Sequence, residues 1–166
     1  MVVVIFGVAG VGKTTVGKVL AEDLGWKFFD ADDFHSAPNI EKMRSGIALT
    51  DEDRQLWLQQ LRGLIERSLK TNESAVLACS ALKKKYRDKL RVGSDVKFVF
   101  LRADRERIAN QLENRRGHYF DPKLLDAQFT DLEEPESAED AVTVEITGEP
   151  RDVAKKIESI LRGRSQ

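Results

Sequence analysis

The chain has 166 residues, and its 27 Lys and Arg residues nearly balance 28 Asp and Glu residues, which leaves a formal net charge of −1. This length fits a single domain, over residues 1–166, that can bury most of its apolar surface. The balanced charge excludes a general attraction to nucleic acid or to anionic membranes, so we expect any cationic site to be local.

The cysteine content and the first residues bear on the compartment. Cys79 is the single cysteine, which excludes an internal disulfide and fits a reducing environment. Residues 1–12 are apolar, but they carry no basic leader and are too few for a membrane span. We therefore expect a soluble, cytoplasmic protein without nucleic-acid or membrane partners.

Short apolar runs, rich in β-branched or aromatic residues, alternate with helical patterns. We predict strands at Val2–Phe6, Lys27–Asp30, Ala75–Cys79, Val96–Leu101 and Val142–Ile146. We predict helices at Lys13–Leu24, Ile40–Ser45, Asp51–Thr71, Lys83–Arg91, Asp104–Asn114, Pro122–Asp131 and Arg151–Arg162. This alternation predicts a three-layer α/β fold, in which a five-stranded parallel sheet carries helices on both faces.

In such sheets, ligands gather beyond the carboxyl ends of the strands. The segments that follow the predicted strands are 7–14, 30–35, 80–87 and 147–150. We expect them to surround one site, which a small lid at about 115–121 closes and a helical segment at about 35–71 covers.

Residues Gly7–Thr14 read GVAGVGKT, which is the phosphate-binding pattern of Gly, any four residues, Gly-Lys and Ser or Thr. The pattern lies between a predicted strand and a predicted helix, a setting that favours triphosphate binding over an ordinary glycine-rich turn. Its backbone N–H groups and the helix N-terminus can surround phosphates, Lys13 can reach the outer phosphates, and Thr14 can ligate Mg²⁺. The predicted nucleotide-binding residues here are Gly7, Val8, Ala9, Gly10, Val11, Gly12, Lys13, Thr14 and Thr15.

Acidic residues follow the second predicted strand, at Asp30, Asp32 and Asp33. One of them could simply cap the next helix. Two acids that alternate off a strand end beside a nucleotide suggest separate roles instead: one holds Mg²⁺ or its water, and the other accepts a proton from a hydroxyl nucleophile.

Cations lie where helix electrostatics disfavour them. Arg54 lies in the first turn of the long predicted helix, which Thr50 and Asp53 begin with a pattern resembling a capping box. Lys83 and Arg87 lie near the start of another helix, where positive charge is unfavourable. A solvated basic face is the simpler interpretation, and we prefer it for Lys84, Lys85 and Lys89. For Arg54, Lys83 and Arg87 we favour a second bound anion, so the acceptor substrate should carry a negative group; which of the three cations holds it stays open.

Arg115, Arg116 and Gly117 follow a predicted helix. They suit a mobile flap that brings positive charge to a phosphoryl group in transfer, although arginines also decorate ordinary helix C-termini. His35 and His118 have no metal-ligand spacing, so a zinc site is not expected, and we predict contacts with substrate hydroxyls for both.

Together these residues resemble the gluconate kinase family of small P-loop kinases, which is related to shikimate kinases. The resemblance covers nearly the whole chain. The matching segments are the phosphate loop, 30–35, Asn39–Met43, Leu49–Arg54, Trp57–Leu58, Cys79–Lys84, Tyr86–Asp88, Arg116–His118, Gln128–Phe129 and Leu132–Pro135. The Cys-Ser-Ala-Leu-Lys-Lys and Leu-Glu-Glu-Pro runs are the most specific of them.

This resemblance implies a P-loop kinase fold, a possible homodimer, and transfer of the ATP γ-phosphoryl group to the 6-hydroxyl of D-gluconate. By similarity to shikimate kinases, Asp30 serves Mg²⁺ and Asp32 holds the acceptor hydroxyl. The loop that ends at Pro150 resembles one that lies against adenine, with Arg115 on its other side. Lys42 and Gln128 join the implied substrate contacts. Many P-loop proteins place an acid after the third strand, whereas this chain has Ser80 there.

The full hypothesis makes Lys13, Asp32, Arg115 and Arg116 the catalytic group. It places Asp32, His35, Lys42, Arg54, Lys83, Arg87, His118 and Gln128 around the acceptor, with Thr14 and Asp30 at the metal. The alternatives are a kinase for another small acid or a nucleoside monophosphate, and a nucleotide-binding switch protein. A switch would not need cations facing a second anion, and the balanced charge disfavours a nucleic-acid 5′-end kinase.

Overall fold

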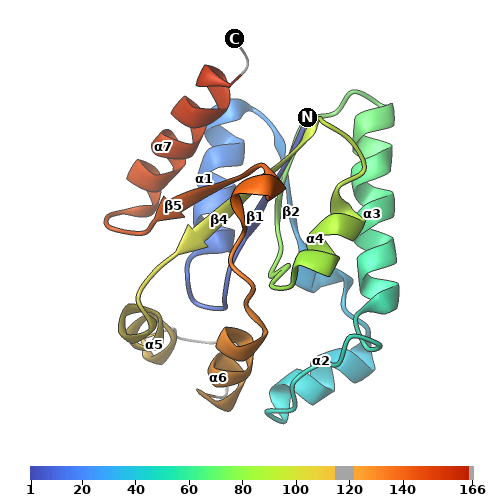
Figure 1. Ribbon diagram of the computed structural model, residues 1–166, viewed down its shortest axis with the longest axis vertical. Coiled ribbons are helices and arrows are strands. Elements are labelled where there is room, and N and C mark those ends of the chain that lie inside the picture. The colour runs from blue at the N-terminus through green and yellow to red at the C-terminus, as the bar shows by residue number, and fades with distance from the viewer. Residues whose placement is uncertain (115–121, 165–166) are drawn as a thin grey trace.

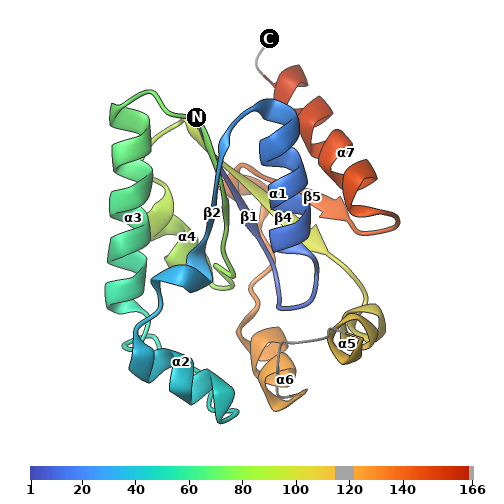
Figure 2. The same ribbon diagram turned by 180° about the vertical axis from the view of Figure 1, so that it is seen from behind.

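The computed structural model describes residues 1–114 and 122–164 and confirms the predicted parallel sheet (Figures 1 and 2). The strands are β1 (Val2–Phe6), β2 (Lys27–Asp30), β3 (Ala75–Ala78), β4 (Val96–Arg102) and β5 (Ala141–Glu145). Their order across the sheet is β2-β3-β1-β4-β5, and every neighbouring pair is parallel. The predicted lid at 115–121, with Arg115, Arg116 and His118, lies outside the described residues.

Helices cover both faces of this sheet. They are α1 (Lys13–Leu24), α2 (Ala37–Arg44), α3 (Gln55–Lys70), α4 (Lys84–Leu90), α5 (Arg105–Glu113), α6 (Pro122–Asp131) and α7 (Pro150–Gly163), with short 3₁₀ turns at Ala31–Phe34 and Ser137–Glu139. Helices α1 and α7 lie on one face and α3 and α4 on the other, whereas α2, α5 and α6 lie beyond the carboxyl ends of the strands (Figure 1). The site-bearing edge of the sheet therefore has its own group of helices.

Two apolar clusters hold the layers together. One joins the sheet to α1 and α7 through residues such as Leu20 and Ile157, and the other joins it to α3 and α4 through residues such as Leu61 and Leu90. β1 belongs to both clusters, because its alternate side chains face opposite layers and all of them are buried. This burial makes the central strand a rigid base for the loop that follows it.

Two helix starts differ from the prediction by three residues or more. Helix α2 begins at Ala37, earlier than expected, because the Ser36 hydroxyl accepts the Asn39 N–H and Pro38 fits the first helical turn. The Thr50 and Asp53 side chains do exchange capping bonds, at 3.0 and 3.1 Å. These bonds close a turn, and α3 begins only at Gln55.

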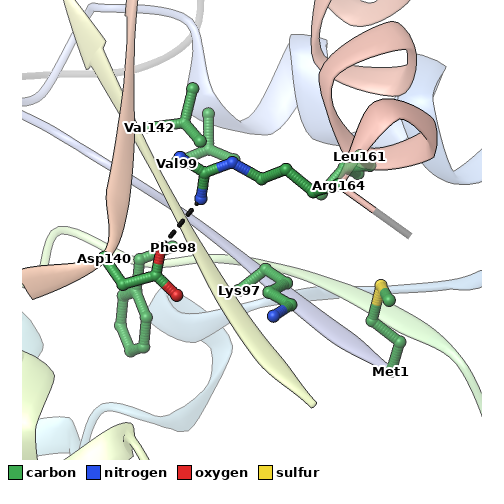
Figure 3. Close-up of a pocket in the computed structure, with 8 residues that line it drawn as sticks. All are labelled: Met1, Lys97, Phe98, Val99, Asp140, Val142, Leu161 and Arg164. Carbon is green, nitrogen blue, oxygen red and sulfur yellow. Dashed lines mark hydrogen bonds and ion pairs between the residues drawn. The ribbon is translucent and has the colours of Figure 1, made fainter. Parts of the chain in front are cut away.

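A small pocket and an ion pair lie near the amino ends of the strands, away from the predicted site. Arg164, just after α7, pairs with Asp140, just before β5, at 2.9 Å (Figure 3). The pocket beside this pair measures only about 20 Å³, which is room for about one water molecule. Every helix in the described ranges is too short or too polar to cross a bilayer.

Candidate active site

A cavity of about 1440 Å³ opens at the carboxyl ends of the strands. The phosphate loop, the segment after β2, Ser80 after β3, and helices α5 and α6 contribute to its wall. Of the predicted site residues, the cavity is lined by Ala9, Gly10, Gly12, Lys13, Thr14, Thr15, Asp30, Asp32, His35, Arg54 and Gln128. The fold thus brings the predicted nucleotide loop and part of the predicted acceptor site into one space.

The phosphate loop needs glycine at its two ends for different reasons. Gly12, the N-cap of α1, has φ of 103°, which side chains rarely tolerate. A Cβ on Gly7 would lie 2.7 Å from the Leu101 carbonyl oxygen of β4. Lys13 Nζ donates to the Val8 carbonyl at 2.9 Å, so the lysine side chain folds back across the loop that it belongs to.

Thr14 and Asp30, the predicted metal residues, are neighbours. Thr14 Oγ1 donates to Asp30 Oδ2 at 2.8 Å, and Asp30 Oδ1 accepts the Asp32 N–H at 3.0 Å. Asp30 therefore caps the turn that presents Asp32 and also lies against the phosphate loop. The cap interpretation is confirmed for the 3₁₀ turn Ala31–Phe34, and the metal role of Asp30 stays a prediction.

His35 lies on the cavity wall as a neutral ring. It stacks on Trp57, with 4.4 Å between ring centroids, and its Nε2 lies 3.8 Å from Asp32 Oδ1. Burial, and then the positive charge of Arg54, lower the pKa of His35 to about 4. Trp57 Nε1 also donates to the Ala31 carbonyl at 2.7 Å, so α3 supports the turn that carries Asp32.

Of the three cations predicted to bind the negative group of the acceptor substrate, Arg54 is the one that lines the cavity. Its Nη1 donates to the Leu49 carbonyl at 2.7 Å and to the Tyr86 hydroxyl at 3.1 Å. Its Nη2 lies 3.9 Å from Asp131 Oδ2, beyond hydrogen-bonding distance. One side of the guanidinium is thus fixed to the protein, and the other lies beside a cavity carboxylate.

Lys83 and its neighbours pair with an acid of the protein itself. Asp51 accepts hydrogen bonds from Lys83 at 3.0 Å and, at shorter range, from Lys85 and Tyr86. These bonds, with that from Lys85 the strongest, hold the pKa of Asp51 well below its usual range. The solvated basic face that we preferred for Lys85 is therefore in part an ion pair.

Arg87 does not face the cavity, which is contrary to the substrate role predicted for it. Its side chain is fully buried, and its Nε and Nη2 pair with both carboxylate oxygens of Glu139, at 2.7 and 2.8 Å. The other donors reach three carbonyl groups, those of Ala81, Leu82 and Glu133. All of its N–H groups are used, so the anion that compensates Arg87 is Glu139 and not a substrate.

Three further predicted residues lie at the margin of the site. Lys42 pairs with Asp53 at 2.8 Å and lowers the pKa of that acid to about 2, but it does not line the cavity. Gln128 does line the cavity, and its Oε1 accepts the Ala9 N–H at 2.6 Å. Pro150 is the first residue of α7 and lies outside the cavity lining; its adenine contact stays a prediction.

Two parts of the cavity wall were not predicted from the sequence. Helix α5 lines the cavity with Asp104, Arg107 and Asn110, and Asp131 lines it from the end of α6. A faint signal existed for α6, because its cavity residues recur at helical spacing: they are Leu124, Ala127, Gln128 and Asp131.

Comparisons with known proteins show the family to which the chain belongs. A family model described as shikimate kinase matches residues 9–162. The thermoresistant gluconokinase of Escherichia coli (strain K12) is 41% identical over 164 residues, covering 97% of this chain and 94% of that protein. The gluconokinase of Arabidopsis thaliana is 40% identical over 171 residues, covering 94% of this chain and 89% of that protein. The chain belongs to the gluconokinase family.

Solved structures of sugar kinases and related kinases have the same fold as this chain. A sugar kinase from Janibacter sp. HTCC2649 superposes with a TM-score of 0.91 at 37% identity, covering 97% of this chain and 94% of that one. A gluconokinase from Sinorhizobium meliloti 1021 superposes with a TM-score of 0.79 at 36% identity, covering 99% and 97%. A shikimate kinase from Acinetobacter baumannii shares the fold, with a TM-score of 0.63 at 22% identity.

Proposed function

We propose that this protein is a gluconokinase, which transfers the γ-phosphoryl group of ATP to the 6-hydroxyl of D-gluconate and releases ADP and 6-phospho-D-gluconate. Membership of the gluconokinase family supports the activity. The observation that carries the proposal is the cavity at the carboxyl ends of the strands, because the phosphate loop, Asp32 and Arg54 line it together.

The proposed chemistry gives each of these residues one role, and it adds Arg115 and Arg116, which lie outside the described residues, by resemblance to the family. The loop Gly7–Thr14 binds the phosphates of ATP, and Lys13 neutralises charge on the outer ones. Asp32 accepts the proton of the 6-hydroxyl of gluconate. The hydroxyl oxygen forms the new bond to the γ-phosphorus, and the bond between that phosphorus and the leaving ADP oxygen breaks. Arg54 meets the gluconate carboxylate, and Arg115 and Arg116 stabilise the phosphoryl group in transfer.

Thr14 and Asp30 suit a magnesium ion. A hydroxyl and a carboxylate 2.8 Å apart are oxygen donors of the kind that Mg²⁺ prefers, and they lie beside the phosphate loop. A bound Mg²⁺ would neutralise phosphate charge there. We further propose a cytoplasmic enzyme; a homodimer stays a prediction.

A panel of acceptors in a coupled ADP-release assay tests the proposal. The panel contains D-gluconate, other aldonates, shikimate and nucleoside monophosphates, and Lys13→Ala serves as the inactive control. We expect D-gluconate to give the highest kcat/KM and a product phosphorylated on oxygen 6. A higher kcat/KM for another acceptor would reassign the substrate, and ATP binding with no turnover of any acceptor would favour a switch protein.

A further inference from the structure

We propose that Asp131 is a specificity-determining residue, which accepts hydrogen bonds from acceptor hydroxyls next to the carboxylate that Arg54 holds. The inference rests on the proposed function and deepens it. It explains why a cavity built for an acidic substrate contains an acid beside its cation.

The position of Asp131 follows from the register of α6. Leu124, Ala127, Gln128 and Asp131 all line the cavity, and this spacing places them on one face of the helix. Gln128 contacts the phosphate loop through the Ala9 N–H, whereas Asp131 lies near Arg54. The same helix face therefore extends from the phosphate loop to Arg54 and Lys83, the cations beside the predicted acceptor site.

Asp131 is not consumed by its cationic neighbours. Its two oxygens lie 3.9 Å from Arg54 Nη2 and 4.0 Å from Lys83 Nζ, which is ion-pair range without hydrogen bonds to either. Lys83 has a nearer partner in Asp51 at 3.0 Å. The Asp131 carboxylate is partly exposed, so its oxygens can accept donors from a ligand.

The charges around Arg54 match an acceptor with one negative group. Three cations (Arg54, Lys83 and Lys85) face two carboxylates (Asp51 and Asp131) in this cluster. One positive charge remains in excess, which complements one carboxylate. A second negative charge on the acceptor would meet Asp131 and be repelled, since like charges close together are unfavourable.

A carboxylate beside a bound carboxylate weakens binding unless the ligand supplies donors to it. A simple acid supplies none, whereas an aldonate carries hydroxyls on carbons 2 and 3, next to its carboxylate. Those hydroxyls can donate to Asp131 while Arg54 takes the charge. Asp131 therefore favours polyhydroxy acids over plain acids and over dianionic acceptors.

The test is a cycle of variants and substrates. We would measure kcat/KM for D-gluconate, 2-deoxy-D-gluconate and 3-deoxy-D-gluconate in the wild type, Asp131→Ala and Asp131→Asn. In the wild type, we expect at least one missing hydroxyl to lower kcat/KM on the order of tenfold to a hundredfold, as for a hydrogen bond to a charged group. In Asp131→Ala we expect that discrimination to fall to within about threefold, with Asp131→Asn between the two.

Asp126→Ala is the matched control, because Asp126 is exposed on the same helix and outside the cavity lining. It should discriminate as the wild type does, and all variants should keep the wild-type KM for ATP. Discrimination that is unchanged in Asp131→Ala, or absent from the wild type, would overturn the inference while gluconate turnover stands. A wild type inactive on gluconate would instead overturn the proposed function, and the inference with it.

Discussion

Asp32 is positioned by the 3₁₀ turn Ala31–Phe34 that follows β2. Its N–H donates to Asp30 at 3.0 Å, and its carboxylate is largely exposed in the cavity, with His35 Nε2 at 3.8 Å. An acceptor hydroxyl in the cavity can reach a carboxylate exposed in this way, as the role of general base requires.

Asp32→Asn should lower kcat for gluconate by about 10²- to 10⁴-fold, because the amide cannot take the hydroxyl proton. The KM for ATP should change little, since the phosphate loop is untouched. Steady-state kinetics with both substrates measure this, with Glu41→Gln, an exposed carboxylate change on α2, as the control. Near-normal turnover would remove Asp32 from the chemistry.

His35 should make the protein less stable in acid. Its pKa is about 4 in the folded state against 6.5 for the free side chain, so the unfolded chain takes up a proton first as the pH falls. Stability from this residue is full above pH 6.5 and is lost toward pH 4. By pH 5 the loss should be about 2 kcal/mol.

Urea unfolding of the wild type and His35→Gln between pH 7.5 and 5 measures that loss. The difference between the two proteins should shrink as the pH falls, since glutamine does not titrate and other groups cancel. A difference that stays constant across this range would show that folding does not lower the pKa of His35.

At the scale of elements, α4 is anchored by one buried ion pair. Arg87 and Glu139 have side chains that are 0% and 3% exposed, and the pair ties α4 to the 3₁₀ turn before β5. The Glu133 N–H also donates to the Leu82 carbonyl at 2.9 Å, which fixes the segment after α6 to the same place. Arg87 thus helps to position the end of α6, because its Nη2 donates to the carbonyl of Glu133 just after that helix.

Removing one partner of this pair should cost about 3–5 kcal/mol, because it leaves the other charge buried and uncompensated. We expect Arg87→Met and Glu139→Gln each to lose stability on this scale in urea unfolding, and Arg87→Met/Glu139→Leu to lose less than the sum. The exposed pair Lys84–Asp88 on the same helix is the control, and breaking it should cost far less stability. Losses equal to those of the control would refute a structural role for Arg87.

The sequence predicted the elements well where the signal is local. The strands are short runs rich in β-branched or aromatic residues, and α1 follows its loop directly, so both were placed within a residue or two. The start of α3 was missed because reciprocal bonds between Thr50 and Asp53 can close a turn as readily as they begin a helix. Local patterns do not tell these outcomes apart.

Lys13, Asp30 and Asp32 line the cavity as predicted, because chemistry and chain position coincide there, and their roles stay predictions. The site was not predictable where a partner decides the role. Arg87 and Lys83 look alike in sequence, yet Glu139, which is 52 residues from Arg87, makes one of them structural. Asp131 looks like any helix carboxylate until the fold brings it near Arg54.

Across the whole molecule, α6 connects the two halves of the cavity. Gln128 holds the Ala9 N–H at 2.6 Å, and Asp131, one turn later, lies near the acceptor cations. In a phosphate loop, backbone N–H groups are the ligands for phosphate oxygens. A nucleotide phosphate that accepts the Ala9 N–H would therefore displace the Gln128 side chain. Because Asp131 lies on the same helix, this displacement would change the free energy of gluconate binding.

Nucleotide and gluconate binding should accordingly be coupled through Gln128. Calorimetry of a non-hydrolysable ATP analogue with and without gluconate, and the reverse titration, should give one coupling factor, because linkage is reciprocal. We expect about fivefold or more in the wild type, and a value within about twofold of one in Gln128→Ala. That variant should also bind the analogue alone more tightly, since no side chain competes for the N–H. Thr130→Ala, an exposed change on the same helix, should keep the wild-type factor, and an unchanged factor in Gln128→Ala would show that the two half-sites communicate by another route.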